Sequence, residues 1–126
     1  MISMPFLLLV DEVKMKEGKL TATNIFDEVE VSELPTLLPE FHLCMGLLGE
    51  EEDEGETLTL KIRSKNLKKN DVDFPYQHGR DGIIKNVTVK IAKLPISETE
   101  TIFFEVSFRK KLIGKYPLTI KKVGDH

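Results

Sequence analysis

The sequence predicts an all-β protein whose antiparallel strands form a two-sheet β-sandwich of immunoglobulin-like or C2-like architecture, with seven or eight strands. Three observations predict this fold. Apolar and polar residues alternate with a period of two in most segments, turn residues separate these segments at short intervals, and no segment has the apolar spacing of an amphipathic helix. We expect residues 1–126 to form a single domain, since this length is ordinary for one hydrophobic core.

The first third of the chain supplies short strands joined by turns. Residues 6–15 form an apolar run that passes into alternation, and a second strand, residues 20–26, follows a turn that contains Gly18. The alternating residues 28–32 are expected to form an edge or continuing strand. Residues 34–39 contain two prolines, which a central strand does not tolerate, so they are expected to be a connection.

The middle of the chain contains a central strand, an acidic loop and a long connection. Residues 41–48 are apolar on much of both faces, which predicts a strand with neighbours on both sides. Residues 50–56 are almost all acidic and are expected to form a solvated loop. Residues 57–64 alternate cleanly and have a cationic outer face. Residues 65–82 have no periodic pattern, and because connections of this length are often functional, they are the leading candidate for a site.

The C-terminal segments predict three further strands. Residues 84–93 alternate, and Thr101–Lys122 reads as a hairpin in which Phe104 and its neighbours at every second position form an apolar face. Because one hairpin is only marginally stable, the rest of the chain must cover this face. Pro117 lacks an N–H group, so we expect the last strand to lie at a sheet edge or at a bulge.

Charge is distributed unevenly along the chain. The net charge is −3, but residues 1–56 have a balance of −11 whereas residues 57–126 have a balance of +8. One interpretation is that strands from the two halves are neighbours whose outward charges complement each other. The other is a dipolar surface that meets an anionic partner, or a second copy of the chain in a head-to-tail or two-fold association.

The sequence contains no motif for catalysis or for a cofactor. Cys44 lies in an apolar strand and is expected to be a buried thiol, although its spacing from His42 would allow a Cys–His pair on one strand face. The acidic residues 50–56, or a looser set of Asp71, Asp73, Asp81 and His78, could attract calcium, but neither has the ligand spacing of a known site. We therefore expect no enzyme activity, no metal and no cofactor.

Two groups of exposed residues are the candidates for contact with a partner. One is the 65–82 segment and the other is the cationic turn of the closing hairpin. The candidate partner-binding residues are Lys68, Lys69, Phe74, Tyr76, His78, Arg80, Arg109, Lys110 and Lys111. Phe74 and Tyr76 could stack on the bases of a single-stranded nucleic acid, or they could anchor the loop to the core. A pI near 5.7 argues against nucleic acid.

The composition is that of a soluble protein. The longest uncharged apolar run, residues 5–10, is far too short to span a membrane, and the N-terminal residues do not resemble a secretion signal. We therefore expect a cytoplasmic protein without a membrane partner.

Turn and core residues distributed over most of the chain resemble those of a family of small uncharacterised bacterial domains. The matching elements are Asp11-x-Val13, Gly18-Lys19-Leu20, Phe26-Asp27, Leu34-Pro35 with Leu38-Pro39, Phe41-x-Leu43, Phe104-x-Val106 and Gly114-x-Tyr116-Pro117-Leu118. The resemblance implies a single-domain β-sandwich for which no activity or catalytic residue is assigned.

These observations favour a non-enzymatic binding or assembly module. Such a protein would present its loops and an exposed edge strand to a protein partner or to a second copy of itself. The alternative is binding of an anion, nucleic acid included, through the basic second half of the chain. A calcium-dependent module or an enzyme is the third possibility.

Overall fold

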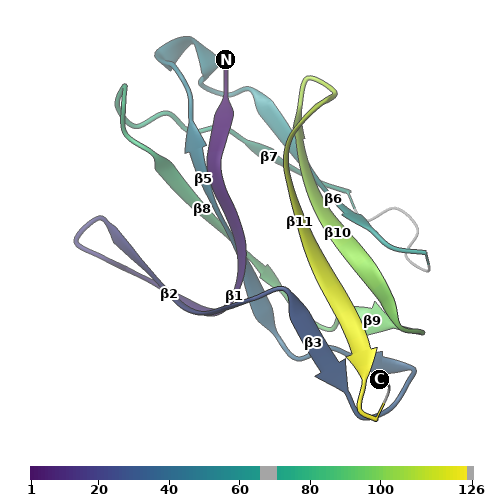
Figure 1. The fold of residues 1–126 in the computed structure, drawn as a ribbon. Helices are drawn as coiled ribbons and strands as arrows, with labels where there is room; N and C mark the ends of the chain where they lie inside the picture. Colours follow the sequence, from purple (N-terminus) through teal and green to yellow (C-terminus); the bar gives the residue numbers. More distant parts are fainter. Residues whose placement is uncertain (66–70, 125–126) are drawn as a thin grey trace.

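The computed structural model describes residues 1–65 and 71–124 (Figure 1). The described chain is built from β-strands, with one short 3₁₀ helix, η1, at Glu51–Asp53. The strands are β1 (Ser3–Lys16), β2 (Lys19–Phe26), β3 (Glu28–Val31), β4 (Thr36–Leu37), β5 (Phe41–Leu48), β6 (Thr57–Arg63), β7 (Asp71–Pro75), β8 (Lys85–Ile91), β9 (Pro95–Ile96), β10 (Glu100–Phe108) and β11 (Lys111–Lys122). The all-β prediction is confirmed.

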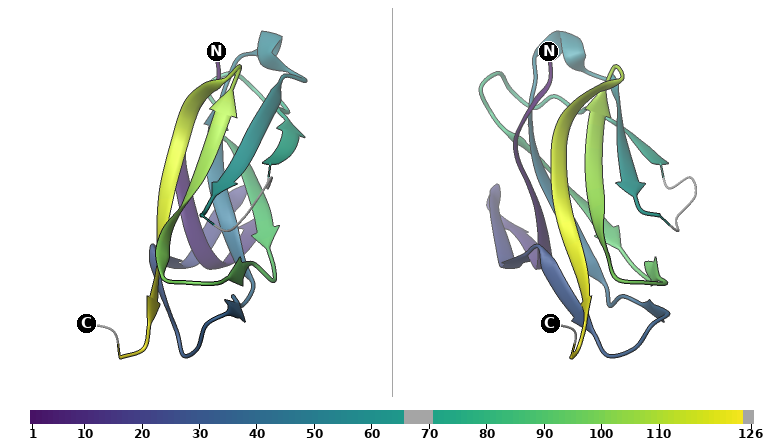
Figure 2. Two further views of the ribbon diagram at one scale, coloured as in Figure 1. Left: turned by 90° about the vertical axis from the view of Figure 1, so that its right-hand side faces the viewer. Right: turned by 45° about the vertical axis from the view of Figure 1, so that its right-hand side comes forward.

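The strands form two large sheets and one small one. The four-stranded sheet has the order β2-β1-β5-β8, the five-stranded sheet has the order β3-β11-β10-β6-β7, and β4 pairs with β9. The views in Figure 2 show the two large sheets as separate layers. The predicted antiparallel pairing holds for every neighbouring pair in the described residues except one, since β3 runs parallel to β11.

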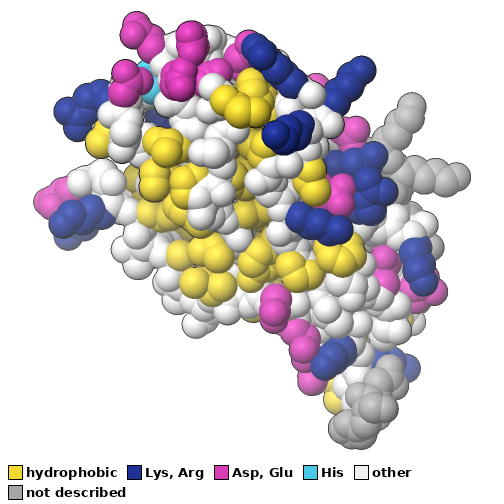
Figure 3. All heavy atoms as spheres, turned by 45° about the horizontal axis from the view of Figure 1, so that its top comes forward, with side chains coloured by type: hydrophobic (Ala, Val, Ile, Leu, Met, Phe, Trp, Pro, Cys, Tyr) yellow, Lys and Arg dark blue, Asp and Glu magenta, His cyan; other side chains and the backbone are white. Residues whose placement is uncertain are grey.

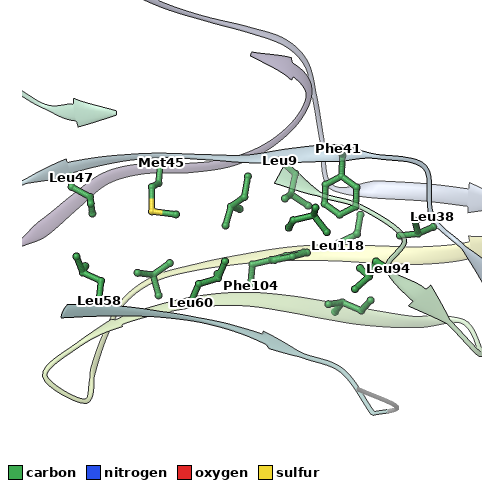
Figure 4. Close-up of a cluster of buried hydrophobic side chains, with 14 of the residues drawn as sticks. Leu9, Leu38, Phe41, Met45, Leu47, Leu58, Leu60, Leu94, Phe104 and Leu118 are labelled. Carbon is green, nitrogen blue, oxygen red and sulfur yellow. The ribbon is translucent and has the colours of Figure 1, made fainter. Parts of the chain in front are cut away.

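The hydrophobic core lies between the two large sheets (Figure 4). Leu9, Met45 and Leu47 project from the four-stranded sheet toward Leu58 and Leu60, which belong to the five-stranded sheet. Each of these side chains is almost completely buried. Because successive side chains of a strand point to opposite faces, the period of two in the sequence is sufficient to place one apolar row of each strand in this core.

Two predicted elements occupy the expected positions. Residues 41–48 form β5, which lies between β1 and β8 and is buried along most of its length. The closing hairpin forms β10 and β11, and its predicted inward row, Phe104 included, is buried except for the half-buried Tyr116.

The structure also corrects the expected strand pattern. The described residues contain more strands than the seven or eight that we expect, partly because β4 and β9 are only two residues long. A further strand, β7, lies inside the 65–82 segment and pairs with β6. Its sequence, DVDFP, is too short to give a periodic signal. Its extended conformation is decided by its pairing with β6.

The position of Pro117 agrees with the expected edge. Although β11 lies between β10 and β3, β3 pairs with it only from Thr119 to Lys122. Within the described residues, the part of β11 before Thr119 pairs with β10 alone. Pro117 therefore lies where one side of the strand is open, and it is paired with Phe103 on the other side. We call residues 111–118 the open edge of β11.

Ion pairs connect the two oppositely charged halves of the chain. Lys121 lies 3.1 Å from Glu28, Lys90 lies 3.1 Å from Glu40, and Arg109 lies 2.7 Å from Glu56. In each pair the acid belongs to residues 1–56 and the base to residues 57–126. The expectation that neighbouring strands bring complementary charges together holds for Lys121 and Glu28, which lie in the paired strands β11 and β3. Within residues 1–65 and 71–124, no helix has the length and apolarity needed to cross a membrane.

Candidate functional site

One end of the molecule brings together several features that are distant in the sequence. The N-terminus, η1 and the turn between β10 and β11 lie at this end in both views of Figure 2. Figure 3 shows hydrophobic side chains in a band across one face, with acidic side chains gathered above the band and Lys and Arg side chains at its upper right. This combination of apolar surface and both signs of charge makes the end the candidate functional site.

A groove with a volume of about 970 Å³ opens at this end. Residues from the start of β1, from η1 and from the β10–β11 hairpin form its walls. The lining residues are Met1, Ile2, Ser3, Met4, Glu52, Asp53, Phe108, Arg109, Lys111, Leu112 and Ile113. Leu112 is 49% exposed, so an apolar surface is presented to solvent. We call this cavity the end groove.

The open edge of β11 continues from the end groove. Gly114 lies so close to β1 that a Cβ atom there would be 2.3 Å from the sulfur of Met4. The missing side chain thus allows β1 and β11, strands of different sheets, to approach each other without pairing. Among the described residues, no strand forms a ladder with this side of β11 before Thr119, and this side lies next to an apolar groove.

The hairpin turn presents the cationic residues. Arg109 and Lys110 have φ angles of 52° and 65°, the left-handed conformation that a two-residue hairpin turn with matching twist requires. The Arg109 side chain donates a hydrogen bond to Glu56 and its guanidinium carbon lies 5.1 Å from the centre of the Phe108 ring. Arg109 is thus held in place, while Lys110 and Lys111 are exposed and Lys111 lines the end groove.

The acidic segment forms a folded wall and includes a buried carboxylate. Asp53 is buried, accepts a hydrogen bond of 2.8 Å from the backbone N–H of Glu50, and lies 3.2 Å from the Met1 ammonium group. The backbone hydrogen bond from Glu50 is the main cause that lowers the pKa of Asp53 below its usual value.

The Asp53 contacts predict how stability responds to acid. Since the folded protein lowers the pKa of this carboxyl, the ionised form stabilises the fold above the unfolded pKa of about 3.9, and this contribution is lost as the pH falls through the lower folded value. Asp53→Asn should therefore be less stable than the wild type at pH 7, and the difference should shrink below about pH 4. Urea unfolding at a series of pH values measures this difference. A difference that stays constant into strong acid would contradict the assignment.

A hydrogen-bonded network lies beside the acidic segment. The Tyr76 ring is buried, its hydroxyl lies 2.9 Å from Nδ1 of His78, and Nε2 of His78 lies 2.9 Å from Asp81. The His78 backbone N–H also donates to Glu54. Burial raises the pKa of the Tyr76 hydroxyl, which therefore stays protonated at neutral pH. This network fixes the 76–81 loop against the acidic segment.

The candidate residues in the 65–82 segment occupy different environments. Lys68 and Lys69 lie outside the described residues. Phe74 is half-buried and packs against the core, and Tyr76 is part of the core, as expected for an anchor that holds the loop. The imidazole of His78 is almost buried, whereas Arg80 is exposed. Neither aromatic ring is thus presented to solvent as a fully exposed stacking surface.

The basic outer face of the five-stranded sheet is partly neutralised by acids. The nearly buried carboxylate of Glu105 lies 3.1 Å from Arg63 and 3.9 Å from Lys115. Lys61 is opposite Asp71 in the register of β6 and β7. These contacts reduce the positive field that would attract a nucleic acid.

Cys44 lies on the outer face of the four-stranded sheet, opposite Leu8 and Thr88 of the neighbouring strands. It is fully buried as a free thiol, and burial raises its pKa, whereas a nucleophilic cysteine needs a lowered one. His42 directs Nδ1 to the backbone oxygen of Asp11 at 3.2 Å. In the described parts of the chain, no three His, Cys, Asp or Glu side chains are grouped so that they could hold a metal ion.

Sequence reasoning did not find the apolar lining of the end groove. Ile2, Met4 and Ile113 were not candidates, because isolated apolar residues near a terminus or in a hairpin are equally typical of a core. The exposed Leu112, next to three consecutive cationic residues, is the one signal that could have indicated this groove.

Comparison with known proteins places the chain in a family but does not supply a function. A search of curated proteins gives no match. Residues 5–121 match the model of DUF6941, which is described as a family of unknown function. This range includes β5 and the closing hairpin, whose residues carry the resemblance to uncharacterised domains noted above. Since the match extends over most of its length, the chain belongs to the family DUF6941.

Proposed function

We propose that this protein is a non-enzymatic binding module that accepts an extended segment of a protein partner at the end groove and the open edge of β11. The observation that carries the proposal is that, in the described residues, β11 before Thr119 pairs with β10 alone, and that this stretch lies next to the exposed apolar lining of the groove. An extended peptide can add to such an edge through main-chain hydrogen bonds, while pockets select its side chains.

The lining of the end groove indicates the chemistry of the bound segment. Leu112 and Met4 offer apolar contacts, so the segment should have apolar side chains at alternate positions. Glu52 lies on one wall, whereas Lys111 lies on the wall formed by the hairpin. A segment with charges of both signs would therefore complement the groove better than a uniformly charged one.

The sequence also bears on the class and location of the protein. The absence of a catalytic motif in the sequence favours a binding protein over an enzyme, and the composition favours a cytoplasmic location. The facing sheets and the intervening core support an immunoglobulin-like arrangement.

A selection with a displayed library of random linear peptides tests the proposal. Peptides retained by the wild-type protein should lose at least about tenfold in affinity for Leu112→Asp, because the new carboxylate would have to be desolvated in an apolar contact. Val123→Asp is the matched control, since Val123 is also exposed but lies at the C-terminal end of the described chain. Calorimetry measures the affinities, and a melting curve establishes that both variants are folded.

The comparison of the two variants decides the result. Equal affinity of Leu112→Asp and Val123→Asp for every retained peptide would show that binding occurs elsewhere, and failure to retain any peptide would also contradict the proposal.

A further inference from the structure

The four-stranded sheet is apolar on its outer face as well as on the face that packs on the core. In the register of β1 with β5, Leu8 is opposite Cys44 on this outer face. Cys44 is fully buried, yet neither residue belongs to the hydrophobic cluster between the two large sheets. An antiparallel sheet that has one face in water normally alternates apolar and polar residues. The outer face of this sheet therefore does not resemble a face that is left to solvent.

The five-stranded sheet follows the usual pattern. Its outer face has Lys61 and Arg63 on β6, and the carboxylate of Glu105 lies near both Arg63 and Lys115. The apolar outer face is therefore specific to the four-stranded sheet.

Side chains from neighbouring strands form a continuous apolar surface on this face. The Phe6 ring and Ile84 meet over Gly46, where a Cβ atom would lie 2.4 Å from the ring and 2.8 Å from Ile84. Ile84 is 41% exposed and Ile25 is 58% exposed. We call this surface the outer patch, and it consists of Phe6, Leu8, Val10, Ile25, Leu48 and Ile84. Within residues 1–65 and 71–124, no further strand or helix forms a layer outside it (Figures 1 and 2).

One end of the outer face is cationic. The register of β1 with β2 places Lys14, Lys16 and Lys19 on the same face of the sheet as the outer patch, and all three are exposed. Glu12 lies on this face and Glu17 lies in the turn, so the end keeps a net positive charge.

The opposite end of the sheet is acidic. β5 ends there at Leu48, and the acidic segment follows it in the chain. A hollow of about 480 Å³ at this end is lined by acidic residues, which are Glu50, Glu51, Glu52 and Asp81. Along β1, Leu8 and Val10 lie between the two charged ends. The charges are therefore arranged so that a second copy, turned end for end, would complement them.

The surface area of the chain is large enough for a stable dimer. The chain exposes 8079 Å², whereas a compact monomer of 14.4 kDa exposes about 6800 Å². The excess is larger than the area of about 800 Å² that each partner buries in a standard interface. At about 16 Å² per residue, from the rise and the strand spacing, the four-stranded sheet presents about 600 Å² in projection, and the accessible area of its side chains is larger.

From these observations we infer that the outer patch of one copy of this chain packs on the outer patch of a second copy across a two-fold axis. The axis lies between the two sheets and crosses the strands along the row of Leu8, Cys44 and Thr88. The cationic end of each copy then lies against the acidic end of the other. Because both copies use the same surface, the assembly closes as a dimer. The inference goes beyond the proposed function, since no outer-patch residue lines the end groove.

Sedimentation velocity tests the inference. The wild type should be dimeric at about 100 μM, because interfaces of standard size have micromolar or tighter affinities. Ile25→Asp introduces two carboxylates into the apolar contact of each dimer, so it should weaken association at least about tenfold. Leu37→Asp is the matched control, since Leu37 is also 58% exposed but lies in β4, outside the outer patch. It should associate as the wild type does, and melting curves establish that both variants are folded.

Cysteine cross-linking tests the position of the axis. Thr88 is exposed in the row that the axis follows, so the new thiols of Thr88→Cys should meet and form a disulfide-linked dimer on mild oxidation. Thr101→Cys is the control, because Thr101 is exposed on the outer face of the five-stranded sheet, and it should stay unlinked.

Three results would overturn the inference. They are a wild type that stays monomeric at about 100 μM, which would leave another protein as the occupant of the outer patch, equal dimerisation of Ile25→Asp and Leu37→Asp, and cross-linking of Thr88→Cys no greater than that of Thr101→Cys. The effect of Leu112→Asp on peptide binding is measured independently, so either proposal can fail while the other stands.

Discussion

Phe104→Ala is expected to lower the free energy of unfolding by about 3–5 kcal/mol. Phe104 is fully buried in β10, and its ring is edge-on to that of Phe41 with 6.2 Å between centroids. Phe41 in turn meets Phe26 at 5.8 Å, so the three rings connect both large sheets. Removing the Phe104 ring leaves a cavity in close-packed surroundings, where neighbouring side chains relax only in part. Urea unfolding followed by fluorescence or circular dichroism measures the loss.

Phe103→Ala is the matched control for this change. It removes the same type of side chain from the next position of the same strand, but Phe103 lies on the outer face with Lys115 4.4 Å from its ring centre. The expected loss is about 1 kcal/mol. A loss for Phe104→Ala no greater than that for Phe103→Ala would contradict the placement of the core between the two large sheets.

Tyr76→Ala is the second change with a large expected effect, again about 3–5 kcal/mol. The Tyr76 ring is 1% exposed and packs so closely on Gly49 that a Cβ atom there would lie 2.8 Å from the ring. Its backbone N–H donates to the Glu56 oxygen at 2.8 Å, which connects the loop after β7 to the start of β6. Loss of the ring should therefore loosen the 76–81 loop as well as destabilise the fold.

Tyr76→Phe separates the hydroxyl from the ring. It removes the hydroxyl's contact with His78 at 2.9 Å and its hydrogen bond with the Gly49 backbone, and the expected loss is about 1–2 kcal/mol. Urea unfolding gives both values, and the imidazole resonances of His78 report the loop by NMR. If Tyr76→Ala costs no more than Tyr76→Phe, the ring is not the anchor that the structure indicates.

Much of the fold could be predicted because apolar residues at every second position mark the buried face of a strand. Phe104 and its alternate neighbours, and the apolar residues of β5, were placed correctly for this reason. Which strands pair with each other was harder to predict from the sequence. The parallel contact of β3 with β11 joins residues near positions 29 and 120, and no local pattern encodes such a distant neighbour.

The candidate site could be predicted only in part. The cationic turn Arg109–Lys111 was identified from its charge, and two of its residues, Arg109 and Lys111, line the end groove. Tyr76 was also singled out, but it is buried, because a large aromatic ring in a loop is equally suited to anchor the loop. The open edge of β11 depends on where β3 stops pairing with β11, and the end groove depends on how the start of β1, η1 and the β10–β11 hairpin meet, both of which tertiary structure decides.

Amide hydrogen exchange on the complex with a library-selected peptide tests the central claim most directly. If an extended segment adds to the open edge of β11, amides within residues 111–118 should exchange more slowly in the complex than in the free protein. The 76–81 loop, already fixed by Tyr76 and His78, should change little. Protection confined to that loop, with residues 111–118 unaffected, would contradict the claim.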